Sequence, residues 1–241
     1  MLFNAGATDR FGRVEDGTTT TDYDSEEIKR QISISAALAP LEWKNHKINI
    51  IDVPGYFDFV GEMIEALRVA DGAVIVVGAV SGMAVGTEKA WDYCEKYGTP
   101  RMIFVNQMDR EHANYMKVID QLKEKYGTAI VPFHIPIMES GQFKGYVNAI
   151  DMTAREFNGK EVKQIPIPDQ MLDEVEPIRT MIVEAVAETS EELMEKYFEG
   201  EEFTDEEIRT AIRKGVLDGE IVPVLCGSAR NNAGSKELMD E

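Results

Sequence analysis

Three uninterrupted apolar runs constrain the fold more than any other feature of the sequence. They are DGAVIVVGAV (residues 71–80), RMIFVN (residues 101–106) and EIVPVLCGSA (residues 220–229). Runs of this kind are typical of strands buried on both faces, as in a parallel sheet. Amphipathic patterns around residues 88–97 and 112–126 alternate with the first two runs and predict crossover helices. The predicted fold class is therefore α/β, with a mostly parallel sheet flanked by helices.

The segments before the first apolar run predict a hairpin and a loop. Residues 32–43 and 47–52 have strand character and are separated by the short polar turn KNH. Residues 58–68 have an amphipathic helical pattern. Residues 14–31 are polar, acidic and rich in Thr and Asp, which indicates a mobile loop.

From about residue 129 the pattern changes, and residues 129–219 are predicted to form an inserted α+β subdomain. Strands are expected at 129–137 and 144–151, a proline-spaced connector at 165–171 and helices over 172–215. The chain thus divides into a core at 1–128, the insertion, and a return to the core at 220–241. Within the last helical stretch, Thr204 and Glu207 fit a capping box and Gly215 fits a helix stop.

Charge is unevenly distributed along the chain. Lys and Arg number 25 against 44 Asp and Glu, a formal charge of −19, which argues against a chain that binds free nucleic acid. Residues 134–219 hold 20 acidic and 9 basic side chains, so this segment alone contributes −11. The acidic helices are either a surface for a protein partner or ordinary solvated faces, and the second interpretation is at least as well supported.

Other residue classes exclude several kinds of protein. Cys94 and Cys226 are far apart and no signal-peptide pattern precedes them, which predicts a cytoplasmic location. The three histidines are scattered and lack the spacing of a zinc site. No apolar run approaches the ~20 residues that span a bilayer, so no membrane association is expected.

Three polar turns follow three apolar strands. Asp52-Val-Pro-Gly55 follows KINII, Asn106-Gln-Met-Asp109 follows RMIFV, and Cys226-Gly-Ser-Ala229 follows IVPVL. The Asp-x-Pro-Gly stretch alone is more readily explained as an ordinary turn. Open α/β sheets, however, bind their ligands at the carboxyl ends of strands, and the three turns in this order are together quite specific.

The chemistry of the second and third turns suits a guanine base. One carboxylate can accept both N1–H and the exocyclic amine of guanine, and Asp109 is the candidate. Its alternative role is a helix N-cap. Asn106 is expected to tie the neighbouring turns together, while the backbone N–H groups of Ser228 and Ala229 are expected to face the guanine carbonyl oxygen.

The first turn suits a phosphate and its metal ion. Asp52 is a candidate to hold Mg²⁺ through water, because carboxylate oxygens suit this hard cation. The N–H of Gly55 is expected to reach a terminal phosphate, since no side chain obstructs it.

Taken together, these segments resemble the GTP-binding domain of translational GTPases, and most of all elongation factor G or a paralogue of it. The resemblance covers essentially the whole chain through EEIKRQISI, DVPGYFDF, NQMD, IPIPDQML, KYFEGEEFTDEEIRTAIRKG and CGSA. It implies a P-loop-type GTPase fold, GTP or GDP with Mg²⁺ as cofactors, and hydrolysis coupled to the ribosome. It adds Gln107 and Gly227 to the nucleotide-binding residues.

One family motif is absent from this sequence. No stretch matches G-x-x-x-x-G-K-[ST], the loop that cradles phosphates. By family comparison, we expect the chain to lack this loop and the strand before it, on the order of 20 residues. That strand would lie between KINIID and DGAVIVVG, so the sheet is expected to be unstable, swapped or rearranged there. The chain by itself is then expected to be a nucleotide-incompetent fragment.

Three motifs depart from the family pattern in single residues. Arg30-Gln-Ile-Ser33 stands for Arg-Gly-Ile-Thr and keeps a hydroxyl for Mg²⁺ at Ser33. Tyr56 stands where the family histidine positions the attacking water, and a phenol cannot become the cation that histidine can. Gln107 replaces a lysine whose stem packs over the base.

These departures leave two interpretations of the intact parent open. In the first, it is a GTPase of the elongation factor G type with slow or altered hydrolysis. In the second, it is a regulatory or ribosomal-protection factor that binds GTP and hydrolyses it poorly. In either case, residues 14–31 are expected to become ordered only with GTP and Mg²⁺.

Overall fold

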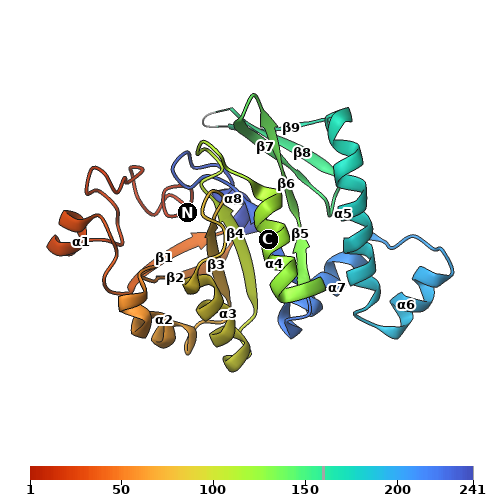
Figure 1. Cartoon of the computed structure of the whole chain (residues 1–241), viewed down its shortest axis with the longest axis horizontal. Coiled ribbons are helices and arrows are strands. Elements are labelled where there is room, and N and C mark those ends of the chain that lie inside the picture. The colour runs from red at the N-terminus through yellow and green to blue at the C-terminus, as the bar shows by residue number, and fades with distance from the viewer. Residues whose placement is uncertain (159–160, 241) are drawn as a thin grey trace.

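The centre of the computed structural model is a four-stranded parallel sheet, and the structure describes residues 1–158 and 161–240. The strand order is β3-β4-β10-β5 (Figure 1). The strands are β3 (Ala73–Gly78), β4 (Arg101–Asn106), β10 (Val222–Cys226) and β5 (Ile130–Pro132). The expected parallel α/β sheet is confirmed.

Helices α3 (Val85–Tyr97) and α4 (Tyr115–Tyr126) follow β3 and β4, as the crossover pattern predicts. They share a hydrophobic core with the sheet, in which Ile103 and Leu122 are fully buried. Because the two helices connect parallel strands, they place the ends of β3 and β4 at the same edge of the sheet.

The expectation that the run 71–80 is buried on both faces is wrong for β3. Ile75 and Val77 are buried, whereas Val74 and Val76 on the other face are 45% and 58% exposed. β3 lies at the end of the sheet, and only its face with Ile75 and Val77 is covered by the core. Every residue of β10 is buried, so the prediction holds for that central strand.

The predicted hairpin is present and forms a separate two-stranded sheet. Its strands are β1 (Ala37–Trp43) and β2 (His46–Asp52), which pair antiparallel. Lys44 and Asn45 form the turn and both have positive φ, 46° and 65°, as a two-residue type I′ hairpin turn requires. In the described chain, β2 and β3 belong to different sheets and do not pair.

The middle of the chain contains a second, antiparallel sheet with order β6-β7-β8-β9. Its strands are β6 (His134–Glu139), β7 (Gln142–Asn148), β8 (Thr153–Asn158) and β9 (Glu161–Ile165). Sequence reasoning anticipated strands near β6 and β7 but missed β8 and β9. Gly159, Lys160 and Glu241 lie outside the described residues. The short strand β5, which begins the segment expected to be inserted, pairs with β10 in the parallel sheet.

Helices α5 (Asp169–Ala187), α6 (Glu191–Phe198) and α7 (Asp205–Asp218) complete this region. Buried side chains of α5 and α7 form a second core with β6, β7 and β8. Figure 1 shows α6 at one extremity of the molecule, opposite the N-terminal loop.

The capping box predicted at the start of α7 is present, but the predicted helix stop is wrong. Thr204 and Glu207 cap each other as expected, whereas the left-handed residue that ends the helix is Gly219, with φ 77°. Gly215 lies inside the helix, and a Cβ there would stand 2.7 Å from Cδ1 of Ile221. This glycine therefore permits close packing and does not end the helix.

The remaining elements are short. They are α1 (Ser25–Arg30), η1 (Phe57–Phe59), α2 (Val60–Leu67), η2 (Gly127–Ala129) and α8 (Ser235–Asp240). Helix α1 corrects the expectation that residues 14–31 contain only loop, because a complete capping box stabilises it. None of the described helices has the length and apolarity needed to cross a bilayer.

Candidate functional site

The carboxyl ends of β4 and β10 bring two of the predicted turns side by side. The strands are parallel, and Val105 lies opposite Cys226 in their register. The turns that begin at Asn106 and Gly227 therefore leave the sheet at the same edge, which is where α/β sheets bind ligands.

Hydrogen bonds join these two turns directly. Ser228 Oγ donates to Asp109 Oδ1 at 2.6 Å, and the N–H of Ala229 donates to Asn106 Oδ1 at 2.9 Å. The N–H of Met108 also donates to the carbonyl oxygen of Gly227 at 3.1 Å. The tie that was predicted for Asn106 is thus present, and the Ser228 hydroxyl separately holds the Asp109 carboxylate.

Two backbone features keep this edge compact. A Cβ on Gly227 would lie 2.4 Å from the carbonyl oxygen of Ala233 and 2.6 Å from Cζ of Phe104, so only glycine fits. Gln107 has φ 65°, a left-handed conformation that directs the chain sharply from Asn106 toward Asp109. Its Oε1 lies 3.5 Å from where a Cβ on Gly78 would stand, which places the side chain beside the end of β3.

The two backbone donors expected to face guanine have partners inside the protein. The N–H of Ser228 donates to the carbonyl oxygen of Ala233 at 2.9 Å, and that of Ala229 donates to Asn106. The predicted contact with the guanine carbonyl oxygen therefore requires one of these donors to be shared or exchanged.

Apart from these two turns, the hairpin and the preceding loop bring Ser33 and Asp52 near the same acidic residue, Asp22. Ser33 Oγ donates to Asp22 Oδ1 at 2.6 Å. Burial raises the pKa of Asp52, and the nearby carboxylates of Asp22 and Glu27 raise it further, against a side-chain hydrogen bond from Thr21 that lowers it. The carboxylates of Asp22, Glu27 and Asp52 therefore lie close enough to repel one another.

The donor set suits magnesium. A hydroxyl and carboxylates are the hard oxygen ligands that Mg²⁺ prefers. Burial is the main cause of the raised pKa of Asp52, and a cation would offset the smaller contribution of repulsion from Asp22 and Glu27. No cluster of three or more His, Cys, Asp or Glu that could hold a metal occurs among the described residues.

Gly55 and Tyr56 lie on the turn after β2. A Cβ on Gly55 would meet no atom within 4 Å, so its backbone faces open space, as a phosphate contact requires. Tyr56 is 56% exposed and precedes η1 with an extended backbone. The phenol is therefore accessible to water at the position where the family histidine is expected.

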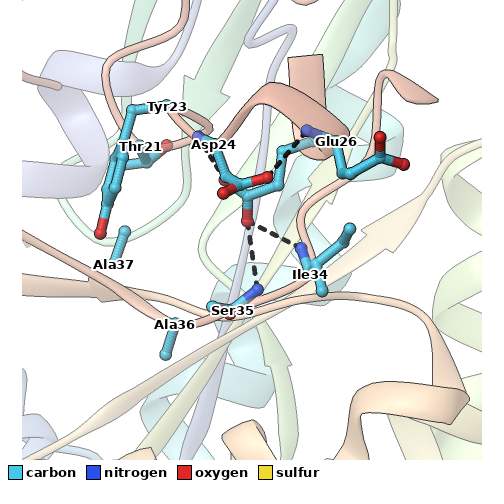
Figure 2. A pocket seen from close by; sticks show the side chains of 9 residues that line it. Thr21, Tyr23, Asp24, Glu26, Ile34, Ser35, Ala36 and Ala37 are labelled. Carbon is cyan, nitrogen blue, oxygen red and sulfur yellow. Dashed lines mark hydrogen bonds between the residues drawn. The ribbon is translucent and has the colours of Figure 1, made fainter. Parts of the chain in front are cut away.

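Sequence reasoning missed three residues of this region, which are Thr21, Asp22 and Glu27. Thr21 and Glu27 help to line a cavity of about 380 Å³ between the loop and the start of β1 (Figure 2). The pattern Asp24-x-x-Glu27 is a capping-box signal that could have located Glu27. No local pattern distinguishes Asp22, because its contact with Ser33 spans 11 residues.

The parallel sheet and the bonded turns at its carboxyl edge define an α/β domain of the guanine-nucleotide-binding class. Comparison with known families agrees, because the model for the elongation factor Tu GTP binding domain matches residues 1–241. The chain belongs to this family and is a GTP-binding domain of the translational GTPase type.

A solved structure supports the same fold. A crystal structure of a protein from Thermus thermophilus superposes with a TM-score of 0.94 at 36% sequence identity. The match covers 99% of this chain and 36% of that chain, so the present chain spans about a third of its length.

Proposed function

We propose that this chain is the GTP-binding domain of an elongation-factor-G-like translation factor, in which GTP hydrolysis is coupled to action on the ribosome. The observation that carries the proposal is the bond from Ser228 to Asp109, which holds a carboxylate at the carboxyl edge of the sheet. Family membership supports guanine nucleotide and the ribosome as partners, and the cytoplasm as location.

The proposed roles at the base end follow from the bonded turns. Asp109 accepts the N1–H and amine of guanine, and Asn106 keeps the two turns together. Gly227 allows the turn to pack closely, and the Gln107 stem lies beside the base. Ser228 orients Asp109, while Ala229 supplies a backbone donor.

At the phosphate end, Ser33 and Asp52 are the proposed ligands of Mg²⁺, which when bound would neutralise phosphate charge. In the proposed site, the Gly55 N–H donates to a terminal phosphate. The proposed role of Tyr56 is to hydrogen-bond the attacking water, for which its neutral phenol offers less stabilisation than an imidazolium.

Replacing Asp109 with Asn tests the base assignment. The amide presents a donor and an acceptor, so it mismatches the two donors of guanine and matches xanthine, whose second ring carbonyl accepts. We expect GDP affinity to fall by about tenfold to a hundredfold and xanthosine diphosphate affinity to rise. Asp71→Asn, at an exposed position before β3, is the matched control. Equal loss of both nucleotides, or no change in either, would count against a guanine site.

A second candidate function is GTP binding with little turnover, and Tyr56 favours it. In this case GTP acts as a conformational ligand of a regulatory or ribosomal-protection factor. Tyr56→His is then expected to raise single-turnover GTP hydrolysis without changing GDP affinity. An unchanged hydrolysis rate would contradict the second candidate.

A third candidate concerns the chain by itself. Because no stretch carries the G-x-x-x-x-G-K-[ST] pattern, phosphate contacts are expected to contribute little to affinity. We therefore propose, as this third candidate, that the chain by itself is nucleotide-incompetent or binds nucleotide only weakly.

The acidic helices offer a site for a protein partner of opposite charge. A shallow groove of about 420 Å³ at α6 is lined by Glu188, Glu191 and Glu195 together with Met194 and Phe198. An apolar slot with an acidic rim suits a basic protein segment. Loss of such binding in Phe198→Ser, but not in Leu217→Ser on the exposed face of α7, would support this role.

A further inference from the structure

Glu27 is a buried carboxylate inside an otherwise polar and exposed loop. Its residue is 3% exposed, whereas its neighbours Glu26 and Ile28 are exposed. Charged side chains are rarely buried to this degree unless several donors satisfy them. The partners of Glu27 therefore indicate what the residue does.

Both oxygens of Glu27 accept hydrogen bonds from backbone N–H groups. Oε1 accepts from Ile34 at 2.9 Å and from Ser35 at 3.1 Å, and Oε2 accepts from Asp24 at 3.1 Å. The bonds from Ile34 and Ser35 join α1 to the segment that leads into β1, and Figure 2 shows Ile34 and Ser35 across the pocket from Asp24 and Glu26. The hydrogen bond from Ile34 is the largest cause of a lowered pKa of Glu27, which opposes the effect of burial.

These contacts surround Ser33, the proposed magnesium ligand. Glu27 binds the two N–H groups that directly follow Ser33, and Glu62 Oε2 accepts from the next one, Ala36, at 2.7 Å. The hydroxyl of Ser33 meanwhile donates to Asp22 at 2.6 Å. Carboxylates thus fix both the backbone after Ser33 and the rotation of its hydroxyl.

A hydroxyl has one proton and two lone pairs. Since the Ser33 proton points to Asp22, the lone pairs are the part of the oxygen left to face a cation. Groups that orient a metal ligand in this manner commonly set metal affinity without touching the metal.

We propose that Glu27 is a positioning residue for Ser33, whose backbone it holds in a place from which the hydroxyl can face a metal ion. The metal role rests on the proposed function, because it assumes that Ser33 binds Mg²⁺. The hydrogen bonds of Glu27 close the segment between Asp24 and Ser35.

The first test measures closure without nucleotide or metal. Trypsin can cut after Lys29 and Arg30, which lie in α1 beside Glu27. Glu27→Gln presents an NH₂ group to N–H donors, so we expect cleavage at these sites to accelerate at least about tenfold. Glu65→Gln is the matched control, because Glu65 is an exposed glutamate of α2, whereas Glu26 pairs with Lys29 and Arg30, the residues at which trypsin cuts. Equal cleavage rates in both variants and the wild type would overturn the proposal.

The second test separates positioning from simple stabilisation. Mn²⁺ is used as the probe, and its affinity is measured by electron paramagnetic resonance in the presence of GDP. Glu27→Gln is expected to weaken Mn²⁺ binding by about tenfold, the lower end for residues that orient metal ligands, with GDP affinity in EDTA unchanged. Loss of thermal stability with unchanged Mn²⁺ affinity would reduce Glu27 to a structural residue and overturn the metal role.

Two further outcomes are decisive. If the wild type binds neither GDP nor Mn²⁺, the proposed function and the metal role of Glu27 fail, whereas the cleavage test still decides whether Glu27 closes the loop. If Glu27→Gln does not fold, hydrogen exchange of the nucleotide-free wild type replaces it. Ile34 and Ser35 amides that exchange as slowly as those of β1 support the proposal, and exchange at the rate of a free loop overturns it.

Discussion

Removing the Ser228 hydroxyl is expected to weaken both the fold and guanine recognition. Ser228 is fully buried, and its Oγ donates to Asp109 at 2.6 Å while accepting the N–H of Asn231 at 3.2 Å. The first bond is charge-assisted and contributes about 1.5–3 kcal/mol, whereas the second contributes about 1 kcal/mol. Ser228→Ala is therefore expected to cost about 3 kcal/mol of unfolding free energy.

Thermal denaturation followed by circular dichroism measures this cost. For a chain of this size about 1 kcal/mol corresponds to roughly 2–4 °C, so the transition is expected to fall by about 6–12 °C. Ser25→Ala, at an exposed position in α1, is the control and should shift the transition little. The same Ser228→Ala variant should lower GDP affinity, because Asp109 loses the contact that orients it. A transition within about 2 °C of wild type would refute the energetic reasoning.

Three further perturbations test other parts of the structure. Gln31 ends α1 in the left-handed conformation, with φ 56°, which glycine adopts at less cost. Gln31→Gly should therefore raise the urea midpoint by an amount equivalent to about 0.5–1 kcal/mol, and a lower midpoint would contradict this prediction. Gly215→Ala should lower the melting temperature despite the better helix propensity of Ala, because the new Cβ meets the buried Ile221. A higher melting temperature would show that the Ile221 side chain can shift to make room for the Cβ. The bond from Lys196 lowers the pKa of Glu207 to about 2, so this carboxylate stabilises the fold above its unfolded pKa near 4.5 and the effect is lost as pH falls toward 2. Glu207→Gln should therefore reduce stability at neutral pH more than at about pH 2.5, and an equal loss at both pH values would argue against the ion pair.

The elements predicted best are those whose signal is local. The run that became β10 is apolar throughout and that of β4 is apolar between Arg101 and Asn106, and their central position in the sheet explains why burial followed the pattern. The capping box of Thr204 and Glu207 was also found, because both partners lie within one turn of helix. In these cases the residues that give the sequence signal are the same residues that form the element.

Elements determined by distant contacts were missed or misread. Strands β8 and β9 have polar sequences, TAREFN and EVKQI, and form through pairing with β7 and with each other. Gly215 looked like a helix stop, but its role is to accommodate Ile221 six residues later. Propensity could not reveal either feature, because tertiary packing decides both.

The candidate site divides in the same way. Asn106, Asp109, Ser228 and Ala229 were predicted from their turns, and the structure joins them by direct hydrogen bonds. The acidic residues around Ser33 were not predicted, because an uninterrupted polar stretch gives no periodic signal. Buried hydrogen bonds, and not the residue types alone, distinguish Glu27 from Glu26.

The most direct test of the account is whether this chain distinguishes guanine from adenine through Asp109. Saturation-transfer NMR detects weak binding, so we would titrate the wild type and Asp109→Asn with GDP, ADP and xanthosine diphosphate in Mg²⁺. The account predicts that GDP but not ADP binds to the wild type, and that the variant prefers xanthosine diphosphate. Equal signals from GDP and ADP, or no GDP signal from the wild type, would contradict the claim that this chain forms a guanine site.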